Sequence, residues 1–87
     1  MLSIFPNPAK DIITIQNPYS QTQEITTFGI EIYTINGKQI RTKALNPLLY
    51  HQQINIELLS NGVYYVKFVI DSEIKETVKL VVARGVR

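Results

Sequence analysis

The sequence contains no cysteine, no tryptophan and only one histidine among its 87 residues. Without cysteine, disulfides, thiolate catalysis and cysteine-based zinc sites are excluded. Charged residues make up 18% of the chain and the net charge is +2, too small to favour nucleic acid as a partner. We therefore expect a domain stabilised by its apolar core alone, with no cofactor, no metal and no nucleic acid bound.

Long apolar runs are missing as well. No stretch approaches the roughly 18 apolar residues of a membrane span, so no transmembrane segment is predicted. The first ten residues lack a basic start, and Pro6 and Pro8 interrupt any signal-like apolar run. If the protein leaves the cytosol, we expect its export signal to lie on a segment outside these 87 residues.

The chain does contain strand periodicity, because apolar residues recur mostly at every second position. Its length predicts a single domain over residues 1–87. The predicted strands are 2–5, 11–17, 27–35, 38–44, 52–58, 62–70 and 74–82. Seven short strands separated by turns predict an all-β fold, an immunoglobulin-like antiparallel β-sandwich of seven strands.

Alternation along these strands also predicts the core. Its expected members are Ile13, Ile15, Ile30, Ile32, Ile54, Ile56, Tyr64, Val66, Phe68, Val78 and Leu80. Asn36-Gly37 predicts a type I′ hairpin, which needs positive φ at both central residues. In "LLSNGVYY", Leu59, Gly62 and Tyr64 are typical of a tyrosine corner, in which the hydroxyl bonds an upstream backbone group. The alternative is that Tyr64 is simply a half-buried aromatic residue.

Candidate catalytic and metal-binding residues are few. His51 is expected in a polar loop, and no serine lies in a nucleophile-elbow context, so a catalytic triad is not predicted. Asp71, Glu73 and Glu76 surround one turn but supply too few oxygens for calcium, and a solvated turn is the simpler interpretation. Exposed aromatic residues could stack on sugars, and those expected outside the core are Tyr19, Phe28, Tyr33 and Tyr50.

Four segments then occur in a fixed order: "FPNPAKDIITI", "IEIYTINGKQI", "INIELLSNGVYYVKF" and "ETVKLVV". Together they resemble the type A C-terminal sorting domain of the type IX secretion system, also called the Por secretion system C-terminal sorting domain. The matching positions are Pro6, Asn7, Pro8, Asp11, Gly37, Lys38, Leu59, Gly62, Tyr64, Thr77, Lys79 and Leu80. The chain differs from the usual pattern at Phe5, Asn55 and Glu57 and in its longer tail. Proline geometry makes the Pro-Asn-Pro corner stiff, so it serves the architecture, a partner contact, or both.

The resemblance implies a sorting signal for a larger cargo protein located N-terminal to this domain. The cargo would cross the periplasm and outer membrane of a Gram-negative bacterium to become secreted or attached to the cell surface. The implied partners are the type IX secretion machinery and its sortase-like protease, and the domain itself would not be an enzyme. The alternatives are an immunoglobulin-like accessory module, which binds carbohydrate or supports a catalytic domain, and a small hydrolase.

Residues 77–87 are predicted to contact the export machinery. This segment contains part of a strand and three positive side chains without an acidic one, and a localised charge steers association. The predicted recognition residues are Thr77, Lys79, Leu80, Arg84 and Arg87. We expect removal of residues 84–87 to leave the sandwich folded. The alternative is that residues 77–82 only cover the core and that the tail is disordered.

Overall fold

The computed structural model describes residues 1–21 and 24–85. These residues form seven strands and one short 3₁₀ helix, η1 (Pro18–Gln21). The strands are β1 (Ser3–Phe5), β2 (Ile12–Gln16), β3 (Phe28–Thr34), β4 (Gln39–Leu45), β5 (His51–Asn55), β6 (Gly62–Ile70) and β7 (Glu73–Val82). In this part of the chain, no helix has the length and apolar character needed to cross a membrane.

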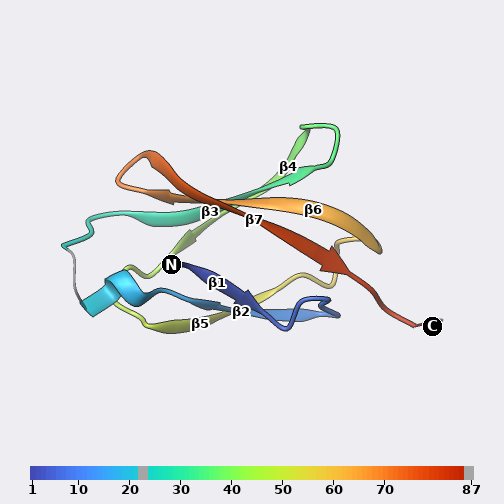
Figure 1. Ribbon diagram of the computed structural model, residues 1–87, viewed down its shortest axis with the longest axis horizontal. Helices are drawn as coiled ribbons and strands as arrows, with labels where there is room; N and C mark the ends of the chain where they lie inside the picture. Colours follow the sequence, from blue (N-terminus) through green and yellow to red (C-terminus); the bar gives the residue numbers. More distant parts are fainter. Residues whose placement is uncertain (22–23, 86–87) are drawn as a thin grey trace.

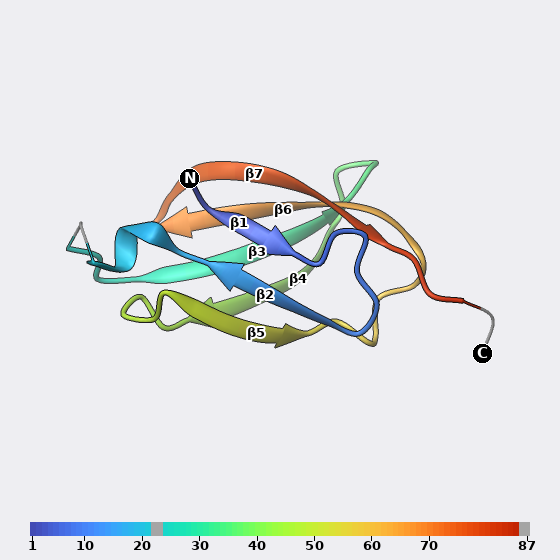
Figure 2. The ribbon, with the colours of Figure 1, turned by 60° about the horizontal axis from the view of Figure 1, so that its bottom comes forward.

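The strands form two sheets that pack face to face (Figure 1). The smaller sheet has the order β1-β2-β5, and the larger has the order β4-β3-β6-β7. All neighbouring strands within each sheet are antiparallel, so the predicted immunoglobulin-like sandwich is confirmed. The edge strands β1 and β7 belong to different sheets but run in the same direction along one side of the molecule (Figure 2).

The core lies between the sheets and consists of the inward-facing side chains of alternating positions. Every predicted core residue is buried except Val78, which is partly buried and packs against the others. The predicted register of β6 is confirmed, because Tyr64 and Val66 are buried while Tyr65 remains 40% exposed. Burial extends further than predicted, to Leu2, Ile4, Ala9, Asn17, Phe28, Leu59 and Ile70. The prediction that Phe28 lies outside the core was wrong, because its ring stacks on Phe68 at 6.2 Å between centroids.

The predicted type I′ turn at Asn36-Gly37 was also wrong, although the hairpin itself is present. Only Gly37 has a positive φ, of 88°, and the loop is closed by a bond from Thr34 N to Lys38 O at 2.9 Å. This is a three-residue loop that ends in a left-handed glycine, a common alternative to the two-residue turn. Two positive φ values instead occur at Asp71 and Ser72, in the turn between β6 and β7.

Candidate recognition site

The terminal strand β7 places the predicted recognition residues in different surroundings. Thr77 and Lys79 are exposed on the outer face of the larger sheet. Leu80 points the opposite way and is fully buried, because successive side chains of a strand alternate between its faces. In the folded domain, a partner can therefore touch Thr77 and Lys79, whereas Leu80 holds β7 against the core.

The Pro-Asn-Pro corner lies against the outer edge of β7. Asn7 Nδ2 donates to Lys79 O at 2.7 Å, and Val81 N donates to Asn7 Oδ1 at 2.9 Å. The Asn7 amide thus pairs with the strand edge in the way that the backbone of a neighbouring strand would. Both peptide bonds that precede the corner's prolines, Phe5–Pro6 and Asn7–Pro8, are cis.

Backbone bonds continue this contact beyond Asn7. Ala9 N donates to Val81 O at 2.7 Å, and Ala83 N donates to Ala9 O at 2.9 Å. Ala9 and Val82 thereby form a parallel bridge. The opening corner and the terminal strand, which lie at opposite ends of the sequence, therefore make one structural unit.

Arg84 belongs to the fold and is not a free charge of the tail. Its Nε donates to Asp11 Oδ1 at 2.8 Å, and the Arg84 side chain is only 9% exposed. Its Nη2 donates to Ile56 O at 2.9 Å, and its Nη1 donates to Leu59 O. The guanidinium thus satisfies three acceptors in two loops, the β1–β2 loop and the β5–β6 loop, so removing it is expected to loosen the domain, contrary to the prediction from sequence.

The backbone of Arg84 is held by the loop between β5 and β6. Arg84 N donates to Asn61 Oδ1 at 2.9 Å, and Asn61 Nδ2 donates to Arg84 O at 3.2 Å. Gly62, which follows Asn61 in the loop, has a φ of 157°, a value in the region that favours glycine. The two bonds from Asn61 therefore hold the backbone at Arg84.

The tyrosine corner predicted at Tyr64 is confirmed. Tyr64 is 8% exposed, and its hydroxyl donates to Ser60 O, four residues upstream, at 2.7 Å. Leu59 is buried beside it and contributes both its side chain to the core and its carbonyl oxygen to Arg84. The loop that contains this motif therefore supports the terminal segment as well as β6.

Glu76 connects β7 to the start of the chain. Its two carboxylate oxygens accept from Leu2 N at 3.1 and 3.2 Å, and Oε2 also accepts from the Tyr19 hydroxyl at 3.0 Å. The hydrogen bond to Glu76, with its negative charge and some burial, raises the pKa of Tyr19 above its ordinary value of 10.0. Glu76, predicted as part of a solvated turn, is thus a structural residue.

Asp71 and His51 each have a polar partner from another segment. Asp71 Oδ1 accepts from Thr26 N and Thr27 N, both at 2.9 Å. His51 is the first residue of β5 and not a loop residue as predicted, and its Nε2 lies 3.1 Å from Gln16 Oε1. Within residues 1–21 and 24–85, no three acidic or histidine side chains cluster in a way that could hold a metal.

The aromatic residues considered for sugar stacking do not form one row. Phe28 is in the core, Tyr19 belongs to η1 at the end of β2, Tyr50 precedes β5, and Tyr33 is on the outer face of β3. The family-like Gly37 and Lys38 lie at the tip of the β3–β4 hairpin. Arg87 lies outside the described residues.

The described site offers an exposed strand face with Thr77 and Lys79, supported from behind by Leu80 and from the edge by Asn7. The support was hard to foresee, since nothing in the sequence pairs Asn7 with β7 or Arg84 with Asp11. The sequence offered one indication that this region supports another element: Pro-Asn-Pro and Asp11 lie close together in a segment without helix character.

Comparison with known families gives a match over most of the chain. A family model described as "Secretion system C-terminal sorting domain" matches residues 3–83, which covers every strand. A search of curated proteins found no match. Arg84 lies just beyond the matched residues.

Proposed function

The chain belongs to the family of secretion system C-terminal sorting domains, and we propose that the outer face of β7 is where the export machinery contacts it. Domains of this family are the C-terminal sorting signals of type IX secretion, so they belong to secreted or cell-surface proteins. The observation that supports our proposal is the exposure of Thr77 and Lys79 on a strand whose other side is fixed by buried Leu80.

A fixed strand suits recognition because its side chains are already held in one geometry before the partner arrives, which lowers the entropy lost on binding. Lys79 places a positive charge on this face. Arg84 contributes little to an external field, since its charge is paired with that of Asp11. We infer that Arg84 acts by holding the terminal segment, whereas Lys79 contacts the partner directly.

The rest of the pathway follows from family membership and remains part of the proposal. The cargo precedes this domain, a sortase-like protease separates the two, and passage goes through the periplasm and outer membrane. The domain acts as a substrate and ligand of that machinery without catalysis of its own. The Pro-Asn-Pro corner serves chiefly to hold β7, given that both polar atoms of the Asn7 amide are bonded to that strand.

The test uses a reporter with a periplasmic signal peptide, fused in front of residues 1–87, in a host with type IX machinery. The parent fusion should reach the cell surface, and Lys79→Glu should lower surface delivery severalfold. Lys10→Glu is the matched control, because Lys10 is exposed in the β1–β2 loop and the charge change is identical. If Lys79→Glu and Lys10→Glu are both delivered like the parent, the face of β7 is not the contact.

A second variant tests the tail separately. Ending the chain after Arg84 keeps the contacts of Arg84 with Asp11, Ile56 and Leu59 but removes Arg87. Delivery equal to the parent is expected. A loss of delivery with an unchanged melting temperature would move the signal from β7 to the last three residues.

A further inference from the structure

The two sheets of the sandwich differ sharply in charge. The strands β1, β2 and β5 contain no lysine, arginine, aspartate or glutamate. Every charged strand residue belongs to the larger sheet, from Glu31 on β3 to Lys79 on β7. The outer face of the larger sheet therefore differs chemically from the outer face of the smaller one.

Strand register arranges six outward side chains of the larger sheet in two rows. The first row crosses β3, β6 and β7 through Tyr33, Tyr65 and Lys79, which are direct cross-strand neighbours. The second row crosses the same strands through Glu31, Lys67 and Thr77. We call these six residues the outer patch. It contains Thr77 and Lys79, so the proposed contact on β7 is one margin of a larger surface.

Interactions inside the outer patch leave its positive charge available. Lys67 Nζ lies 4.3 Å from the centroid of the Tyr33 ring. The carboxylate of Glu31, the one acid of the patch, accepts from the Tyr33 hydroxyl at 2.7 Å. This bond raises the pKa of Tyr33 above its ordinary value of 10.0, with burial and the Glu31 charge contributing less. The two positive charges of Lys67 and Lys79 exceed the one negative charge of Glu31, so the outer patch is positive overall.

Tyr65 occupies the middle of the first row and is 40% exposed, between Tyr33 and Lys79. Tyrosine is enriched at the energetic centres of protein interfaces, because it combines a large rigid ring with a hydroxyl. A ring flanked by cations on a flat sheet fits a protein surface with an apolar strip between carboxylates.

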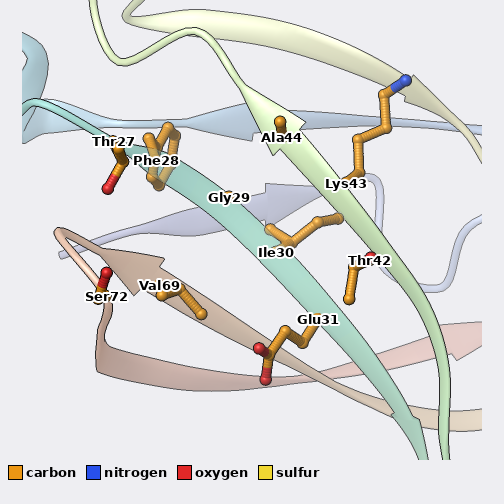
Figure 3. A pocket seen from close by; sticks show the side chains of 10 residues that line it. All are labelled: Thr27, Phe28, Gly29, Ile30, Glu31, Thr42, Lys43, Ala44, Val69 and Ser72. Atoms are coloured by element: carbon orange, nitrogen blue, oxygen red, sulfur yellow. The ribbon is translucent and has the colours of Figure 1, made fainter.

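A shallow hollow adjoins the second row of the patch. Its floor is the next cross-strand row, Ala44, Gly29 and Val69, in which two residues have little or no side chain. Figure 3 shows Glu31 and Thr42 at one end of the hollow and Thr27 and Ser72 at the other. Its volume is about 250 Å³, room for one side chain of a partner.

We propose that the secretion machinery binds the whole outer patch, with Tyr65 at its centre, through an acidic protein surface that places carboxylates opposite Lys67 and Lys79. This inference rests on the proposed function, since it extends the contact from β7 to β6 and β3. Between Cα positions, the outer patch spans about 7 Å along β6, from one row to the other, and about 10 Å across the three strands. This is below the ~800 Å² per partner of stable complexes, which suits a transient contact with a passing substrate.

The experiment repeats the reporter assay with changes on β6, which the terminal motif does not include. Tyr65→Ser and Lys67→Glu should each lower surface delivery about tenfold, as expected for central interface residues. Tyr50→Ser is the control for Tyr65, because Tyr50 is also 40% exposed but lies in the β4–β5 loop. Lys10→Glu is the control for Lys67. Melting temperatures of the purified domains show whether each variant is folded.

The partner's charge is tested by comparing Lys67→Gln with Lys67→Glu. An acidic partner predicts that charge reversal lowers delivery more than neutralisation does. Equal losses would overturn the acidic surface. An anionic membrane is the other class of partner, so the purified domain is also mixed with vesicles of phosphatidylcholine and phosphatidylglycerol. Co-sedimentation that Lys67→Glu abolishes would overturn a protein partner.

The outcomes separate this inference from the proposed function. If the parent is delivered and Lys79→Glu is not, while folded Tyr65→Ser and Lys67→Glu are delivered like the parent, the contact is confined to β7 and the inference is wrong. If the parent fusion itself stays in the periplasm, both proposals fail. If Tyr65→Ser does not fold, Tyr65→Gln, which is neutral and covers more of the sheet than serine does, replaces it with the same expected loss.

Discussion

Asn7 and Lys79 are separated by 72 positions in the sequence, yet the Asn7 side-chain amide donates to the Lys79 carbonyl oxygen at 2.7 Å. The same amide accepts from Val81 N at 2.9 Å. An exposed strand edge is prone to pair with other chains unless it is covered or interrupted. Asn7 covers the edge of β7 beside the exposed side chain of Lys79, so it protects the strand and leaves its outer face accessible.

Replacing Asn7 with leucine should lower the free energy of unfolding by about 1 kcal/mol, because two exposed hydrogen bonds are lost. Hydrogen exchange at the Val81 amide should become faster, since its acceptor is gone. Asn36→Leu, in the exposed β3–β4 loop, is the matched control and should leave Val81 unaffected. Unchanged exchange at Val81 would show that Asn7 does not protect the edge.

Replacing Arg84 with methionine should lower the free energy of unfolding by roughly 2 to 3 kcal/mol. The reason is that the hydrogen bonds of a charged group are lost and the partly buried carbonyl oxygens of Ile56 and Leu59 lose their donor. The partial exposure of Asp11 limits the loss, since water can solvate its carboxylate. Urea denaturation measures the change. Ending the chain after Arg84 is the control and should unfold at the parent's midpoint; equal midpoints for all three proteins would contradict a structural role.

Tyr64→Phe should destabilise the domain by about 1 kcal/mol, the usual net value of one hydrogen bond, because Ser60 O loses its donor. Tyr65→Phe, at the neighbouring outward position, should change the denaturation midpoint little. The comparison isolates the hydroxyl, given that both variants keep the ring. Similar shifts in the two variants would indicate that the corner bond adds nothing.

Stability should decline at alkaline pH partly through Tyr19. Its pKa is raised in the folded state, so above about pH 10 the unfolded chain binds fewer protons and unfolding becomes easier as pH rises. Below that pH, the contribution is fully present. Glu76→Gln should weaken this decline, while Glu73→Gln, in the same strand, should leave it unchanged. Denaturation at about pH 9 and about pH 11 measures both slopes, and identical slopes would contradict the Glu76 bond.

Local pattern was enough to predict the strands and the core. The isoleucines of β2 and β3 alternate, and a period of two admits only one buried face once a core forms. The Leu59, Gly62 and Tyr64 spacing likewise predicted the corner, because every group involved lies within a few residues. The hairpin at Gly37 was found by the same means, but its turn type depended on the closing pair of Thr34 and Lys38.

The recognition site required more than local pattern. The alternation of side chains along β7 was enough to predict that Thr77 and Lys79 lie on the opposite face from Leu80. It could not show that Arg84 turns inward to Asp11, because a basic residue near a chain end looks the same whether it is solvated or buried.

The sequence by itself therefore determined the seven strands, most of the core and membership of the sorting-domain family, since strands and core follow from neighbouring residues and the family from four short motifs in a fixed order. Only the tertiary structure decided which charges remain free, what covers the edge of β7 and which strands share the outer patch. The physical reason is that these features depend on pairs such as Asn7 with Lys79, which lie 72 positions apart, and such pairs meet only after both sheets have packed.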